Sequence, residues 1–173
     1  MQTRDGVLGL LGELDDELSH AGARGDVFIV GGAAMVVAYD ARPATRDVDA
    51  VWHPSVEVRH AASRVAARHD DVDADWLNDA VKGFLPVPQP GTGMVVYEGT
   101  ALTVSVPPPE YLLATKLLAS PVGRDELDIR QLYRICRLTT VDEGLDLVER
   151  FYPGRPIPAK VRFFLEELLG TAG

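Results

Sequence analysis

The chain has 173 residues, 46% of them hydrophobic and 25% charged, which predicts one compact globular domain that includes a helical region. Its 26 acidic and 17 basic residues give a net charge of −9, which disfavours a broad, sequence-independent nucleic-acid binder. The single cysteine excludes an intramolecular disulfide and most all-cysteine metal sites. No apolar run approaches the ~18 residues of a membrane span and residues 1–20 lack a signal-peptide core, so we expect a soluble, cytoplasmic protein without membrane contact.

Helices and strands alternate in the first half of the chain. Leucine spacing predicts a helix over 5–20, and the apolar run DVFIV predicts a buried strand over 26–30. Gly31 and Gly32 then open a short helix, and alternation predicts a strand over 47–52. Further predicted elements are a helix over 56–69, an irregular proline-rich excursion in 76–93, and two strands within 94–106 joined by a turn at 98–100.

The remainder of the chain is predicted to be helical. Leucine and isoleucine periodicity, with Pro109 and Thr140 at helix starts, predicts helices over 109–119, 124–137, 141–151 and 158–169. The element order predicts an α+β fold with a small mixed sheet flanked by helices over residues 1–107. Residues 108–173 are expected to form a C-terminal helical region packed on this core.

Two carboxylates follow the glycine corner. Asp47 and Asp49 are predicted to project from one face of a strand, where both can reach the same cation. Glycines at the start of a helix let the backbone approach a phosphate, whose oxygens then meet free amide groups. Mg²⁺ takes one or two carboxylates and completes its shell with waters and substrate phosphates. These residue types therefore point to phosphoryl or nucleotidyl transfer.

The same stretch resembles the polymerase-beta-like nucleotidyltransferase superfamily. The motif is Gly31-Gly32 after a strand, a helix, and then Arg42, Thr45, Arg46, Asp47, Val48 and Asp49. The resemblance is closest to the small bacterial branch with AbiEii-type toxins of toxin–antitoxin pairs, which carries a later lysine and an R-D-x-x-D element on helices. In this chain those positions are Lys116, Arg124, Asp125 and Asp128.

The resemblance implies a minimal nucleotidyltransferase fold that binds an NTP with Mg²⁺ and transfers NMP to an acceptor hydroxyl. Asp47 and Asp49 would bind the metal, Lys116 would contact phosphate, and Asp128 would lie in the same pocket. The implied catalytic residues are thus Asp47, Asp49, Lys116 and Asp128, and the implied nucleotide-binding residues are Gly31, Gly32, Thr45, Arg46 and Arg124.

One feature departs from the family. Many members carry a third carboxylate on a later strand, whereas the matching segment TALTVSV (100–106) has none. Glu98, just before it, or Asp125 and Asp128 on the helical side are the candidate substitutes. The departure leaves a degenerate, non-catalytic nucleotide sensor or antitoxin-type binding partner as the alternative function.

Plain structural interpretations stand beside these. Gly31-Gly32 can be close packing, Lys116 can be a snorkelling edge residue, and Asp125 and Asp128 can be acids favoured by a helix N-terminus. A core tryptophan and a turn asparagine are favoured for Trp76 and Asn78.

The main hypothesis is a toxin-like modifier of tRNA or protein, with a cognate antitoxin as a further partner. A tRNA acceptor requires a basic strip, for which Arg124, Arg130, Arg134 and Arg137 are the candidates. A small-molecule acceptor, such as an aminoglycoside, would instead require Asp71, Asp73 and Asp75 near the site.

Overall fold

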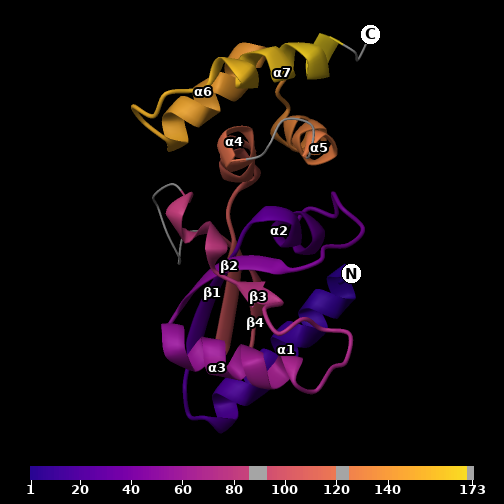
Figure 1. The fold of residues 1–173 in the computed structure, drawn as a ribbon, viewed down its shortest axis with the longest axis vertical. Coiled ribbons are helices and arrows are strands. Elements are labelled where there is room, and N and C mark those ends of the chain that lie inside the picture. The colour runs from indigo at the N-terminus through magenta and orange to yellow at the C-terminus, as the bar shows by residue number, and fades with distance from the viewer. Residues whose placement is uncertain (86–92, 120–124, 171–173) are drawn as a thin grey trace. The chain divides into compact units, whose positions relative to one another are not determined.

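A computed structural model describes residues 1–85, 93–119 and 125–170 (Figure 1). These residues contain seven α-helices, a short 3-10 helix and a five-stranded mixed sheet, which confirms the predicted α+β class. They divide into two compact units, the first of residues 1–83 and 93–107, and the second of residues 108–119 and 125–170 together with 84–85. None of the described helices is long and apolar enough to cross a membrane.

The sheet lies in the first unit and has the strand order β3-β2-β1-β5-β4. The central strand β1 is antiparallel to β2 and parallel to β5, while β4 is antiparallel to β5 and β3 is parallel to β2. The last residues of β1 and β5 therefore meet the first residues of β2, β3 and β4 at one end of the sheet, called here the glycine end. The strands are β1 (Gly25–Ile29), β2 (Val48–His53), β3 (Leu77–Asn78), β4 (Met94–Glu98) and β5 (Leu102–Val106).

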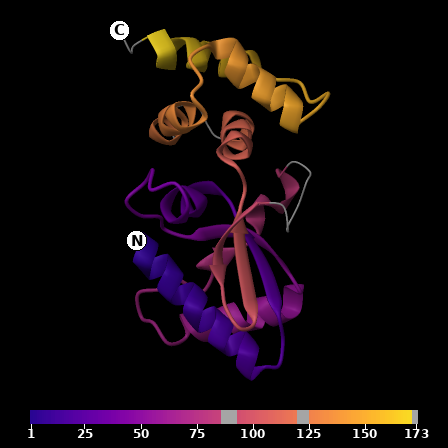
Figure 2. The same cartoon turned by 180° about the vertical axis from the view of Figure 1, so that it is seen from behind.

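Two helices cover one face of this sheet. A β-carbon built on Gly25 would lie 2.9 Å from Val58 of α3 (Ser55–Ala66) and 3.0 Å from Leu18 of α1 (Arg4–His20), so both helices pack on the face of β1 that includes Gly25. Figure 2 shows the whole length of α1. Alternation and strand register place Phe28 and Asp49 on the opposite face, called here the Asp49 face.

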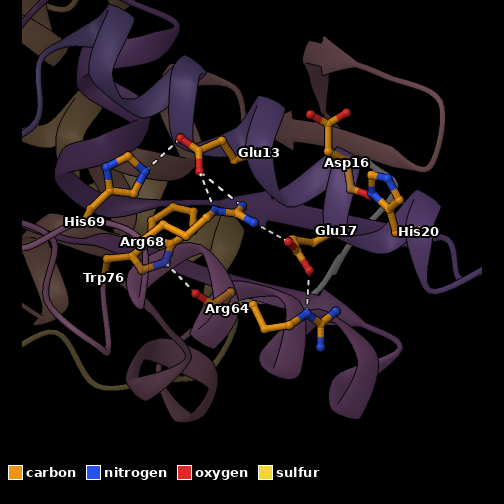
Figure 3. A network of polar contacts seen from close by, with 9 residues as sticks. Glu13, Asp16, Glu17, His20, Arg64, Arg68, His69 and Trp76 are labelled. Atoms are coloured by element: carbon orange, nitrogen blue, oxygen red, sulfur yellow. Dashed lines mark hydrogen bonds and ion pairs between the residues drawn. The ribbon is translucent and has the colours of Figure 1, made fainter.

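Ion pairs join α1 to α3 and the turn after it (Figure 3). Glu17 of α1 accepts hydrogen bonds from both Arg64 and Arg68, and these bonds lower the pKa of the Glu17 carboxyl. Glu13, one turn earlier, lies 3.1 Å from Arg68 Nη2 and 2.8 Å from His69 Nε2. The helix predicted over 56–69 ends earlier, at Ala66, and the His69 ring is half-buried in this network.

A buried carboxylate closes the β4–β5 hairpin. Asp15 of α1 is 7% exposed and accepts hydrogen bonds from the backbone N–H groups of Thr100, at 3.0 Å, and Ala101, at 2.6 Å. A β-carbon at Gly99 would lie 2.2 Å from Asp15 Oδ2, so the turn can approach α1 only because that residue is glycine. The predicted turn is confirmed. Its hydrogen bonds to Asp15 of α1 could not be predicted, because no local sequence pattern indicates them.

The second unit is built of four helices, as predicted. They are α4 (Pro109–Ala119), α5 (Glu126–Cys136), α6 (Val141–Phe151) and α7 (Ala159–Gly170). Thr140 begins α6 with a capping box, in which its hydroxyl accepts from Glu143 N–H while the Glu143 carboxylate accepts from Thr140 N–H. Aromatic packing of Tyr111 on Phe151, with ring centroids 5.5 Å apart, joins α4 to α6.

The segment expected to be irregular is partly regular. Residues 76–85 contain the short strand β3 and a 3-10 helix, η1 (Ala80–Gly83). A two-residue strand is too short to show alternation, which is why the sequence gives no signal for it. The rest of the proline-rich segment, 86–92, lies outside the described residues.

Candidate functional site

The candidate site begins where β1 ends and α2 (Gly31–Val37) starts. The backbone N–H of Val30 donates to the Asp49 carbonyl at 2.8 Å, which continues the β1–β2 pairing to the last residue before the glycines. Because β1 and β2 are antiparallel, the start of β2 is brought beside the start of α2. The sequence motif is thus assembled by strand pairing.

Gly31 is held directly against the Asp49 side chain. It adopts φ +60°, a conformation that side chains disfavour, and a β-carbon there would lie 2.9 Å from Asp49 Oδ2. Asp49 itself is half-buried. Only glycine therefore fits at this corner, for reasons of both backbone and space.

Gly32 faces a second pair of polar side chains. A β-carbon at Gly32 would lie 2.8 Å from Arg42 Nη1 and 3.1 Å from Thr45 Oγ1. Thr45 is buried, and its hydroxyl donates to the Asp47 carbonyl at 3.0 Å. Consecutive glycines thus leave room for a carboxylate on one side and a guanidinium with a hydroxyl on the other.

The loop that carries Arg42 and Thr45 is braced by the N-terminal segment. Gln2 N–H donates to the Thr45 carbonyl at 2.6 Å, and Thr45 N–H donates back to the Gln2 carbonyl at 2.9 Å. Arg4 Nε also donates to the Val37 carbonyl at 3.2 Å. Gln2, just before α1, therefore fixes the position of the loop that precedes the acids, and Arg4 at the start of α1 is bonded to the end of α2.

Asp47 differs from the prediction. β2 begins at Val48, and residues 46–47 form a bend, so the two acids do not share a strand and alternation does not set the direction of Asp47. Asp47 is exposed, and its carboxylate has no hydrogen-bond or ion-pair partner among the described residues. The prediction failed at this residue because the strand pattern extends one position beyond the paired backbone.

The two arginines of the motif are placed differently in the folded loop. Arg46, expected to bind nucleotide, is exposed and makes no hydrogen bond or ion pair within the described residues, whereas Arg42 lies against Gly32. The motif contained both arginines, but only the folded loop distinguishes them. Arg124 lies outside the described residues.

The hairpin of β4 and β5 brings no third carboxylate to the glycine end. β5 contains no acid, and Glu98 pairs with Thr103, which is three residues from Val106 and so roughly 10 Å from the glycine end. The expectation that Glu98 substitutes is therefore wrong, because the antiparallel hairpin places it at the other end of the sheet. Asp71, Asp73 and Asp75 are exposed in the loop before β3.

Lys116, Asp125 and Asp128 form their own cluster, within the second unit. Lys116 Nζ on α4 lies 2.8 Å from Asp128 Oδ2 on α5 and 3.4 Å from Asp125 Oδ1. The side chains of Lys116 and Asp128 are each 8% exposed. The snorkelling interpretation is therefore wrong, and the spacing that the resemblance singled out does bring the lysine and the acids together.

The expected basic strip on α5 is incomplete. Arg130 is bonded internally, to Glu126 at 3.1 Å and to the Leu168 carbonyl at 2.7 Å. Arg137 lies beyond the helix with φ 58°, so it leaves the helical face that includes Arg134. The 3.6-residue spacing alone could show neither the ion pair nor the helix end.

Asn78, for which the sequence favours a place in a turn, lies beside the candidate site. Asn78 of β3 pairs with Asp49 in the parallel β2–β3 ladder, so its backbone lies beside that of the principal acid. Trp76, by contrast, is the expected core residue, 2% exposed, with Nε1 donating to the Ala62 carbonyl at 3.1 Å.

No cluster of three or more His, Cys, Asp or Glu side chains that could hold a metal occurs in the described parts of the chain. A cation here would thus have two carboxylates at most, which fits Mg²⁺ that shares its shell with phosphates and water. Comparison with family models, curated proteins and solved structures finds no match to this chain.

Proposed function

We propose that the glycine end of the sheet binds a nucleoside triphosphate with Mg²⁺, and that the chain transfers NMP to an acceptor hydroxyl on tRNA or protein. The observation that carries the proposal is the contact of the Asp49 carboxylate with left-handed Gly31 at the start of α2. It puts a carboxylate beside backbone amide groups that begin a helix, which together suit a cation and the phosphate it accompanies.

Each side chain of the site has a part in this proposal. Asp49 and the exposed Asp47 would hold the cation, which would neutralise phosphate charge. Arg42, on the other side of Gly32, offers a guanidinium to phosphate oxygens, while the Thr45 hydroxyl, which donates to the Asp47 carbonyl, holds the loop between them. In the transfer, the acceptor oxygen would bond to the α-phosphorus and pyrophosphate would leave.

The transfer also needs a base that takes the proton of the acceptor hydroxyl. The lack of a carboxylate on β5 for this role motivates a second candidate function. β5 has no carboxylate, and Asp125 and Asp128 are bound to Lys116. These observations favour a chain that binds Mg-NTP without transferring it, as a nucleotide sensor or antitoxin-type partner.

Calorimetric titration with each Mg-NTP tests binding, using wild type, Asp47→Asn and Asp49→Asn. Loss of a charged contact should weaken binding at least about ten-fold in each variant. Asp26→Asn is the matched control, because this exposed acid is on the Asp49 face but roughly 13 Å away, at the other end of β1. Wild type that binds none of the four nucleotides would refute the proposal.

A labelled-NTP assay with tRNA and protein acceptors separates the two candidates. Incorporation of label that is lost in Asp49→Asn supports transfer. Tight binding without incorporation supports the sensor or partner function, and copurification with a cellular partner would then be measured next.

A further inference from the structure

Asn78 lies beside Asp49 on the neighbouring strand. The parallel register pairs Val48 with Leu77 and Asp49 with Asn78. Directly paired residues of neighbouring strands project to the same face, and the strands are about 4.8 Å apart. Asn78 is therefore placed on the Asp49 face, next to the acid that the proposed function depends on.

The two ends of the Asn78 carboxamide have different surroundings. Oδ1 accepts a hydrogen bond from the backbone N–H of Ala80 at 3.3 Å, which fastens the turn into η1. The NH₂ group has no partner within the described residues, and the side chain is half-buried. A structural role thus uses the oxygen and leaves two N–H donors.

These donors suit an anionic oxygen rather than a cation. An amide NH₂ cannot ligate a metal, but it donates to acceptors such as phosphate oxygens. Oxygens bound to one Mg²⁺ lie about 2.1 Å from the ion, so a carboxylate and a phosphate oxygen that share it are up to about 4 Å apart. That separation is close to the spacing between neighbouring strands.

We infer that Asn78 is a phosphate-binding residue of this site, whose NH₂ group donates to a polyphosphate oxygen beside Asp49. The inference rests on the proposed function. It assigns β3, the edge strand, a part in recognising the polyphosphate.

Asn78→Asp separates the binding role from the turn. Aspartate has the same shape and keeps an oxygen for Ala80 N–H, but it replaces the donors by a negative charge. The probe is inorganic tripolyphosphate at a saturating Mg²⁺ concentration, and Mg-ATP is measured in parallel. We expect Asn78→Asp to weaken both at least about ten-fold.

Mn²⁺ alone provides an independent readout. A carboxylate next to Asp49 should tighten Mn²⁺ binding several-fold, whereas a side chain directed elsewhere would leave it unchanged. Val56→Asp adds the same charge at an exposed position of α3, which packs on the opposite face of the sheet, and should alter neither measurement.

The outcomes are distinguishable. Tripolyphosphate binding that is lost in Asp49→Asn but unchanged in Asn78→Asp overturns the inference and leaves the proposed function standing. Weakening of Mg-ATP alone overturns the phosphate assignment in favour of a sugar or base contact. If wild type binds neither probe, the proposed function and the inference fall together.

Discussion

Replacing Lys116 by methionine should strongly destabilise the second unit. Methionine is similarly long and unbranched but has no charge. The substitution leaves Asp128, 8% exposed, and Asp125, 21% exposed, close to each other's charge without the ammonium that lies 2.8 and 3.4 Å from them.

The geometry sets the magnitude of this loss. Removing one partner of a buried ion pair costs about 3–5 kcal/mol, because the buried Asp128 carboxylate loses the attraction of an ammonium 2.8 Å away. Asp128→Asn should cost less, about 1–3 kcal/mol, because Lys116 keeps Asp125 as a partner and the amide can still accept a hydrogen bond. The free energy of unfolding should therefore be highest for wild type, lower for Asp128→Asn and lowest for Lys116→Met.

Urea unfolding of the full chain measures both units at once. Trp52 and Trp76 lie in the first unit, so tryptophan fluorescence reports its unfolding, while far-UV circular dichroism also follows the four helices of the second. Lys160→Met, on the exposed surface of α7, is the matched control and should change the free energy of unfolding by less than about 0.5 kcal/mol. A loss below about 1 kcal/mol in Lys116→Met would refute the reasoning, since breaking a buried pair costs more.

Two further predictions concern pH and reactivity. Glu17→Gln should destabilise the protein by less than about 1 kcal/mol at pH 7, because the two arginine partners are nearly half exposed. Since the folded state lowers the pKa of Glu17, this difference should be complete above pH 4.5, decline below it and vanish once the pH is below the lowered pKa of the folded state. A difference that grows on acidification, measured by urea unfolding, would contradict the assignment. Burial raises the pKa of Cys136 to about 12, so at pH 8 about one thiol in 10⁴ is ionised, against about a quarter of unperturbed cysteines. Labelling by iodoacetamide should therefore be about three orders of magnitude slower in the native than in the urea-unfolded protein, and equal rates would show that the thiol is accessible and unperturbed.

Helices were predictable because their signals are local. The leucine spacing of α1 and the Thr140–Glu143 capping box of α6 each act within a few residues, and both helices end within about a turn of the predicted positions. β3 was not predictable, since its two residues become a strand only by pairing with Val48 and Asp49.

The sequence predicts those parts of the site that are formed by residues close to one another along the chain. Gly31 and Asp49 follow from a strand, a glycine corner and an acid in the right order, and folding brings them into contact. The position of Arg42 beside Gly32 depends on how the loop is held by Gln2, which is 43 residues from Thr45 in sequence, so no local pattern predicts it. The position of Asn78 beside Asp49 could not be predicted either, because it depends on the register in which β2 and β3 pair.

The distribution of charge argues for where function should be sought. In the second unit the buried charges of Lys116 and Asp128 are partners of one another. This ion pair holds α4 and α5 together. At the glycine end, by contrast, the Asp47 carboxylate and the Asn78 NH₂ group have no partner within the described residues. These two groups stabilise nothing that the described contacts reveal. A ligand that brings a cation and an anion together, as Mg-polyphosphate does, would give both groups a partner, which is why binding should be measured before catalysis.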